Sequence, residues 1–158
     1  ARGVEDASHI LEQHPTQLKA VYFGAEDFIA DMGGERTREG LEVLYARSKV
    51  VLAAKTRGLL ALDQVVTAFK DDELFLADAK QAKNLGYTGK LCIHPSQVAL
   101  AHQIFAPSEA EVQRARHLLA SYNRGVEQGK GVIEFEGQMV DEPILIKARA
   151  ILKVVDYE

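Results

Sequence analysis

The sequence has 158 residues, 47% hydrophobic and 27% charged, a composition typical of one soluble globular domain. With 19 basic and 23 acidic residues the net charge is −4, and the absence of a basic block argues against nucleic-acid binding. The single cysteine excludes an internal disulfide, and no apolar run approaches the ~18 residues of a membrane span.

Apolar periodicity predicts alternating helices and strands in the first part of the chain. In chain order these are a helix at 4–13, a buried strand at 18–24, a helix at 37–58, a strand at 59–66 and a helix at 71–86. Residues 24–35 are expected to form a loop. Thr37 is the expected N-cap of the long helix, whose apolar face should carry Leu41, Leu44, Tyr45 and Leu52.

The second part begins with a predicted strand at 89–95, which Pro95 ends. Ser108 and Glu111 form a capping box that opens a long helix to residue 129. A short strand or hairpin around Gly137 and a helix over 142–157 follow. The repeated βα order indicates parallel strands with right-handed crossovers. Three strands cannot close a barrel, so we expect either a small open α/β sheet or part of a larger barrel.

Two adjacent acids, Glu26 and Asp27, directly follow the first predicted strand. Functional sites of parallel α/β folds gather at the carboxyl ends of the strands. Mg²⁺ takes one or two carboxylates together with substrate oxygens and water. The pattern therefore fits a metal site, but taken alone it favours one acid that caps the next turn and another that faces solvent.

Cys92 and His94 alternate along the third predicted strand and should point to the same side. Zinc needs three or four ligands, and the other histidines are scattered without a partner cysteine. A Cys–His nucleophile pair is conceivable, but Cys92 stands in an apolar strand. The favoured interpretation is a packed thiol beside a hydrogen-bonded imidazole at a strand end.

Other charged residues have ordinary structural interpretations. Asp141 precedes the terminal helix and fits its N-cap. Arg47 and Lys49 lie in the long helix and are expected at the surface or at a site's rim. The acidic residues 71–73 are expected to form a solvated first helical turn.

Five segments together resemble the citrate lyase beta subunit and its relatives, the malyl-CoA and citramalyl-CoA lyases of the HpcH/HpaI aldolase superfamily. They are ARGVEDA (1–7), GAEDFIADMGGERTREGLEVLYARSKVVLAAK (24–55), GYTGKLCIHPSQV (86–98), FAPSEAEV (105–112) and GQMVDEP (137–143). They follow the family's order and spacing over nearly the whole chain. The superfamily's pyruvate-dependent class II aldolases lack the IHP and MVDEP elements, so the CoA-ester branch is favoured.

This resemblance implies an α/β fold that forms the C-terminal part of a (β/α)₈ TIM barrel. Residues 1–106 would be the last βα units, and residues 107–158 would be an added C-terminal lid of helices and a hairpin. The family's other metal-binding glutamate, and an arginine that holds the substrate, belong to the preceding half-barrel. We therefore expect the chain to be a fragment that is inactive by itself.

The resemblance also implies roles for individual residues. Asp27 matches a carboxylate that binds Mg²⁺, and the backbone around Ala25, Glu26 and Asp27 would hold the keto-acid carboxylate. Leu91 and Cys92 match strand-end positions that line the coenzyme A site. Asp141 matches an acid that reaches from the lid into a neighbouring subunit's site and acts as a catalytic acid or base.

The implied activity is Mg²⁺-dependent, reversible carbon–carbon cleavage of a β-hydroxyacyl-CoA, such as a malyl, citramalyl or citryl thioester, to acetyl-CoA and a keto acid. Two alternatives stay open: a malyl-CoA thioesterase on the same scaffold, and a non-catalytic CoA-binding or assembly module. Shared active sites imply a homo-oligomer, a trimer or hexamer. No nucleic-acid or membrane partner is expected, and the expected compartment is the cytoplasm, or the mitochondrial matrix in a eukaryote.

Overall fold

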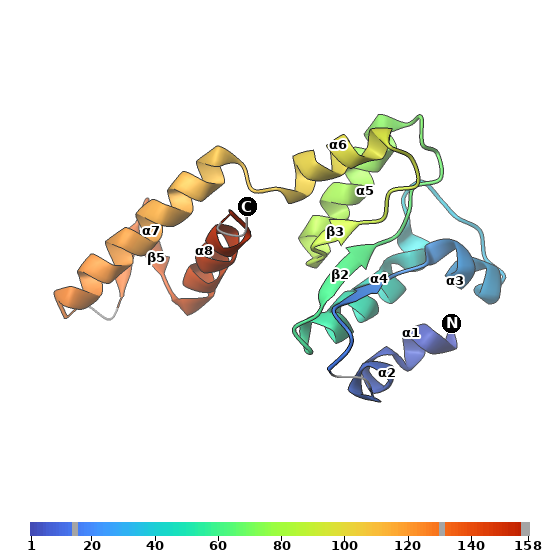
Figure 1. Cartoon of the computed structure of the whole chain (residues 1–158), viewed down its shortest axis with the longest axis horizontal. Coiled ribbons are helices and arrows are strands. Elements are labelled where there is room, and N and C mark those ends of the chain that lie inside the picture. Colours follow the sequence, from blue (N-terminus) through green and yellow to red (C-terminus); the bar gives the residue numbers. More distant parts are fainter. Residues whose placement is uncertain (14–15, 130–131, 156–158) are drawn as a thin grey trace. The chain divides into compact units, whose positions relative to one another are not determined.

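Parallel strands alternate with helices through the first two thirds of the chain (Figure 1). The computed structural model describes residues 1–13, 16–129 and 132–155. Within it the chain divides into two compact units, Ala1–Phe105 and Ala106–Glu158, called here the N-terminal and C-terminal units. The α/β class predicted from the sequence is confirmed by this arrangement.

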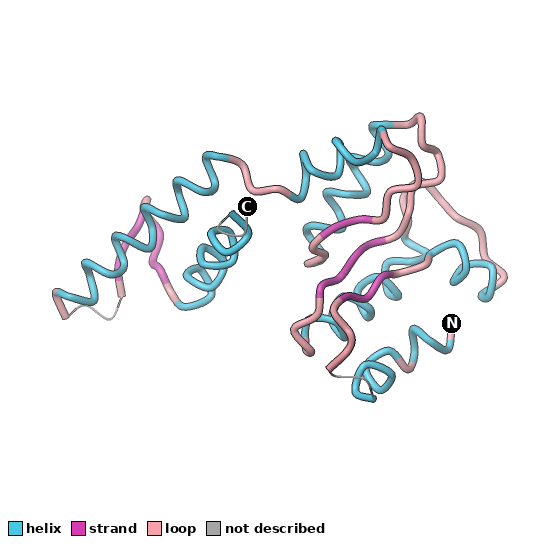
Figure 2. The backbone as a smooth tube through the Cα atoms, viewed as in Figure 1, coloured by secondary structure: helices cyan, strands magenta, loops and turns pink. Residues whose placement is uncertain are grey.

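The N-terminal unit is built around three short parallel strands in the order β1-β2-β3. Its elements are α1 (Arg2–Glu5), α2 (Ala7–Gln13), β1 (Ala20–Tyr22), α3 (Ala25–Met32), α4 (Leu41–Lys55), β2 (Leu60–Asp63), α5 (Asp72–Leu85), β3 (Gly89–Lys90) and α6 (Ser96–Phe105). Each strand is shorter than the apolar run that predicts it, and the rest of each run lies in the loops that join the strands to the helices (Figure 2).

One face of this sheet is packed and the other is bare. Val21 pairs with Ala61, which is fully buried and packs with the buried side chains of α4. Side chains alternate along a strand, so Tyr22 and Leu60 point to the opposite face. They are 66% and 54% exposed. Parallel sheets are normally covered on both faces, so the described part of the N-terminal unit leaves one apolar sheet face open.

Helix α4 differs from its prediction in both its start and its buried face. It begins after Gly40, whose φ is 68°, and not after Thr37. Leu41, Tyr45 and Leu52 are exposed. The packed face carries smaller side chains and one arginine: Val43, Ala46, Arg47, Val50, Val51, Ala53 and Ala54. Because α4 is apolar on several faces, periodicity alone did not identify the face that the strands bury.

Two helices, α3 and α6, occupy stretches for which no helix was predicted. The expected loop over 24–35 contains α3, which ends at Gly33 in the left-handed conformation with φ 68°. Helix α6 begins directly after Pro95. Both helices start within a few residues of a strand's carboxyl end, so they fix the backbone at the edge where sites of this fold class form.

The C-terminal unit pairs two helices with a β-hairpin. Its elements are α7 (Glu109–Glu127), β4 (Ile133–Phe135), β5 (Gln138–Val140) and α8 (Glu142–Val155). The capping box is confirmed, since Ser108 N donates to Glu111 Oε2 at 2.8 Å and Ser108 Oγ accepts from Glu111 N at 3.2 Å. The hairpin around Gly137 is also confirmed. The last residues of the predicted terminal helix, 156–157, lie outside the described residues.

Buried apolar side chains from α7, β5 and α8 form the core of this unit, among them Leu118, Val140 and Leu145. Among the described residues, no helix combines the length and the apolar character needed to cross a membrane.

Candidate functional site

The carboxyl end of β1 leads directly into the GAED stretch. Only Phe23 and Gly24 separate the strand from α3, so Ala25, Glu26 and Asp27 form the first turn of that helix. Ala25 is buried, whereas the side chains of Glu26 and Asp27 are exposed. The backbone N–H groups of a helix's first turn have no partners within the helix, so they favour negative charge nearby.

The two acids of this turn have different surroundings. Glu26 accepts a hydrogen bond from Arg36 Nε at 3.1 Å, and Arg36 Nη1 also donates to Glu42 Oε1 at 2.9 Å. The side chain of Asp27 makes no hydrogen bond or ion pair with any other residue that the structure describes. Of the two carboxylates, only that of Asp27 is therefore free of protein partners and available to an external cation or polar ligand.

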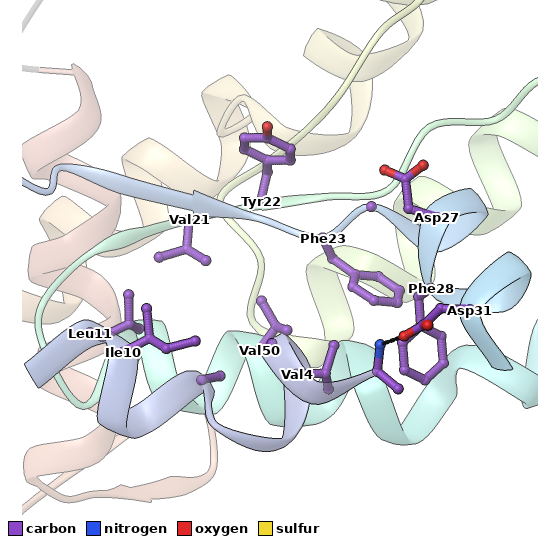
Figure 3. A pocket seen from close by; sticks show the side chains of 14 residues that line it. Val4, Ile10, Leu11, Val21, Tyr22, Phe23, Asp27, Phe28, Asp31 and Val50 are labelled. Carbon is purple, nitrogen blue, oxygen red and sulfur yellow. Dashed lines mark hydrogen bonds and ion pairs between the residues drawn. The ribbon is translucent and has the colours of Figure 1, made fainter.

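Asp27 stands beside an apolar cavity of about 500 Å³ formed by α1, α2, β1 and α3. Figure 3 shows its carboxylate and the Tyr22 ring directed to one side of β1. The side chains of Val21 and Phe28 point to the other side, toward α2 and α4. The Asp27 carboxylate is thus on the side of the bare sheet face and not among the packed apolar side chains.

A second, smaller cavity of about 250 Å³ lies between the start of α3, the segment before α4 and the loop after β2. Arg36 and Arg38 contribute its positive charge. Arg38 donates to Asp71 Oδ2 at 2.8 Å, and this hydrogen bond lowers the pKa of the Asp71 carboxyl. Asp71 also caps α5 by accepting from Leu74 N at 2.9 Å. It is therefore a paired N-cap and not only a solvated acid of the first turn.

Leu91 and Cys92 follow β3 and are both half-buried, so the cysteine stands just after the strand and not inside it. Leu91 N donates to the carbonyl of Asp63 at 3.0 Å, which ties the two strand ends together. Burial raises the pKa of the Cys92 thiol, and the smaller influence of Lys90 opposes this shift. A thiol of this kind is a poor nucleophile at neutral pH.

The imidazole of His94 is engaged by its own turn. Its Nδ1 lies 2.8 Å from Ser96 Oγ and accepts from Ser96 N at 3.2 Å, and the ring stacks on Phe69 with centroids 4.9 Å apart. Within the described part of the chain, no hydrogen bond joins His94 to Cys92. This geometry agrees with the interpretation of a strand-end imidazole and provides no nucleophile pair.

Asp141 belongs to the C-terminal unit and is exposed at the start of α8. Its Oδ1 accepts from Ile144 N at 3.4 Å, a long N-cap hydrogen bond. The structure therefore places Asp27, Leu91 and Cys92 in one unit and Asp141 in the other.

No sequence pattern predicted the buried charge network that lies at the carboxyl ends of β2 and β3. The expectation that Arg47 is a surface or rim charge is wrong, because its side chain is 0% exposed. Arg47 Nε and Nη2 donate to the two carboxylate oxygens of Asp63 at 3.1 and 2.6 Å. Lys90 pairs with both Asp63 and Asp78 and donates to the Gln64 carbonyl at 2.7 Å. The network holds α4 and α5 to the carboxyl ends of β2 and β3.

Metal-binding capacity in the described residues is limited. They contain no group of three or more His, Cys, Asp or Glu side chains that could hold an ion. Mg²⁺ requires fewer protein ligands, because water and substrate oxygens complete its octahedron. The unpaired carboxylate of Asp27 is suited to be one protein ligand of such an ion.

Residues 1–95 match the family model for HpcH/HpaI aldolase/citrate lyase. The chain belongs to this family. It is 57% identical over 150 residues to the citrate lyase subunit beta-like protein of Deinococcus radiodurans. The matched region makes up 95% of this chain and 52% of that protein. The mitochondrial citramalyl-CoA lyase of Mus musculus is 40% identical over 135 residues, 85% of the chain and 40% of that enzyme. The chain thus spans about half the length, or less, of these relatives.

Among solved structures, the chain is similar to the CitE protein of Mycobacterium tuberculosis in complex with magnesium, acetoacetate and coenzyme A. It superimposes with a TM-score of 0.70 and 36% identity, over 84% of this chain and 50% of that one. The family suspected from the five motifs is therefore confirmed.

Proposed function

We propose that this chain is part of a Mg²⁺-dependent carbon–carbon lyase of β-hydroxyacyl-CoA thioesters. The observation that carries the proposal is the unpaired, exposed carboxylate of Asp27 in the first turn of α3, in a chain similar to a protein bound to magnesium, acetoacetate and coenzyme A. The similarity to a citramalyl-CoA lyase supports the choice of a CoA thioester as substrate.

In this proposal, Asp27 supplies one carboxylate ligand to the cation, and the first-turn N–H groups of Ala25, Glu26 and Asp27 bind the carboxylate of the keto acid. The bound cation would act as a Lewis acid toward the substrate's oxygens. Leu91 and Cys92 would line the coenzyme A moiety by shape and by their backbone. These two residues stand at the strand ends that the buried charge network fixes.

The C–C bond between the acetyl carbon and the hydroxyl-bearing carbon breaks, and its electron pair stays on the acetyl carbon as an enolate. The hydroxyl would give its proton to solvent water and become the carbonyl of the keto acid. Asp141, in its protonated form, would donate a proton to the enolate carbon and give acetyl-CoA, and its carboxylate would remove that proton in the reverse direction. We propose that the C-terminal unit is a lid that carries Asp141 into a neighbouring subunit's site, so that the enzyme is a homo-oligomer.

The bare face of the β1–β2–β3 sheet supports a second part of the proposal, that the N-terminal unit is the last part of a TIM barrel. The interior of such a barrel is filled by side chains that project from the strands. Tyr22 and Leu60 are large and exposed on that face, as unfilled interior positions would be.

The test is a divalent-ion titration of the full-length gene product, with turnover of malyl-, citramalyl- and citryl-CoA followed by separate assays of keto acid and free CoA. We expect cleavage to require Mg²⁺ and to stop under chelation. We expect Asp27→Asn to weaken Mg²⁺ activation by at least about tenfold, since a charged ligand is lost.

Asp31→Asn is the matched control for this experiment. Asp31 is an exposed acid of the same helix, and its replacement should leave Mg²⁺ activation unchanged. Turnover that persists under strong chelation would refute the metal role. Free CoA released without keto acid would instead identify a thioesterase.

A further inference from the structure

The loops that follow β2 and β3 are joined by one buried side chain. Gln97, the second residue of α6, is 1% exposed. Its Nε2 donates to the carbonyl of Val66, in the loop after β2, at 2.9 Å. Its Oε1 accepts from the N–H of Ile93, in the loop after β3, at 2.9 Å. One amide group therefore satisfies a buried acceptor of one loop and a donor of the other.

This double contact requires the chemistry of an amide. A carboxylate could accept from Ile93 N but would repel the Val66 carbonyl, and an apolar side chain of the same length would leave both backbone groups unpaired. An unpaired buried backbone group is costly, so without the glutamine the loops would separate or admit water. The exposed Phe69–His94 stack joins the same two loops, but at the surface.

The position of the contact connects it to the proposed site. Ile93 directly follows Leu91 and Cys92, the residues proposed to line the coenzyme A moiety. Leu91 is held on its other side by the hydrogen bond from its N–H to the Asp63 carbonyl. The stretch from Leu91 to Ile93 is therefore fixed at both ends, by β2 on one side and by Gln97 on the other.

We propose that Gln97 is a positioning residue for coenzyme A binding: it holds the Leu91–Ile93 backbone against the loop after β2 and so keeps the CoA-lining wall in one conformation. The inference rests on the proposed function, because it assumes that Leu91 and Cys92 line the CoA site. Gln97 itself does not need to touch the ligand. A prearranged wall binds more tightly because no ordering is required when the ligand arrives.

The experiment compares Gln97→Met and Gln97→Glu in the full-length gene product, with dissociation constants for coenzyme A measured by calorimetry. We expect Gln97→Met to weaken CoA binding about tenfold at every pH, as expected for the loss of a buried hydrogen-bond pair. Gln103→Met, on the exposed face of the same helix, is the matched control and should bind CoA like the wild type.

Gln97→Glu tests the role through the pH dependence of CoA binding. The protonated carboxyl can donate to the Val66 carbonyl and accept from Ile93 N, as the amide does, whereas the carboxylate cannot donate. Burial raises the pKa of such a carboxyl. CoA binding by this variant, relative to the wild type, should therefore be weak near pH ~8 and should recover as the pH falls toward ~5.

A second readout needs no ligand. Cys92, the only cysteine of the sequence, stands within the stretch that Gln97 holds, and its half-buried thiol should react slowly with iodoacetamide. Loosening of the loop should increase the alkylation rate of Cys92, followed on its own peptide by mass spectrometry, several-fold in Gln97→Met over its rate in Gln103→Met. A role limited to general stability would lower the melting temperature without this local change.

The two proposals fail in different ways. A wild-type protein that binds no CoA refutes the proposed function and, with it, the role of Gln97 in CoA binding. A wild type that binds CoA while the Gln97 variants bind it equally well, with no pH recovery in Gln97→Glu, overturns only the inference. Should Gln97→Met fail to fold, the pH series of Gln97→Glu decides, because that protein is compared with itself.

Discussion

Arg47 shows how strongly a residue's environment depends on partners that are distant in the sequence. Its neighbour in the helix, Lys49, lies partly at the surface and pairs with Glu5. Arg47 instead sits within the core, where Asp63, Asp78 and Gln81 receive its hydrogen bonds. These partners stand 16 to 34 positions away. A buried arginine is tolerated because its charge is paired and its donors are satisfied.

Replacing Arg47 with Met should destabilise the N-terminal unit strongly, because Lys90 is then the one charged partner left to Asp63 among the described residues. We expect the free energy of unfolding to fall by about 3–5 kcal/mol in urea denaturation. Arg57→Met is the control, since Arg57 and its partner Glu12 are solvent-exposed, and it should cost less than about 1 kcal/mol. Equal effects of the two replacements would contradict the importance of burial.

Asp141 offers a test of the proposed acid–base role, because Asn preserves an N-cap but cannot exchange a proton. Asp141→Asn should lower kcat about 10²- to 10⁴-fold and leave Mg²⁺ activation and folding unchanged. The neighbouring Glu142, which accepts from Arg149 Nη1 at 2.6 Å, provides the control Glu142→Gln. Unchanged turnover in Asp141→Asn would remove this residue from the mechanism.

At the scale of elements, the close packing of a helix against a strand requires glycine at one position. In α7, Gly125 is buried against the hairpin, and a Cβ atom placed there would lie 2.3 Å from Ile133 Cγ2. The helix and β4 can approach so closely only because position 125 has no side chain.

Gly125→Ala should therefore destabilise the C-terminal unit, even though alanine favours helices. Overpacking of this kind costs about 1–3 kcal/mol, which exceeds the roughly 1 kcal/mol gain in helix propensity. The loss should appear as a lower midpoint in thermal unfolding, and Ile133→Ala in the same chain should relieve part of it. Gly3→Ala in α1, where a Cβ meets nothing within 4 Å, should be neutral or stabilising.

At the scale of the whole molecule, the bare face of the parallel sheet is the feature that most needs explanation. Tyr22 and Leu60 expose large apolar surfaces on one face of the sheet, where parallel α/β folds normally place buried residues. The relatives are about twice as long as this chain or longer. A barrel completed by further strands would cover this face, in line with the proposed architecture.

The sequence by itself determined the α/β class, the capping box, the hairpin and the family, because these depend on local patterns and on motifs in a fixed order. Capping residues and turn glycines act over a few positions, so their effect can be read from the chain. The proposal of a cation site at Asp27 also started from a local motif, two acids next to a strand, and that site stays a prediction.

Only the tertiary structure decided which face of α4 is buried, that Arg47 lies in the core, and that Gln97 joins two loops. Each of these depends on contacts between residues that are far apart in the sequence: Arg47 with Asp63 and Asp78, and Gln97 with Val66. Burial free energy and buried hydrogen bonds arise only when the elements pack, so neither periodicity nor propensity could reveal these partners.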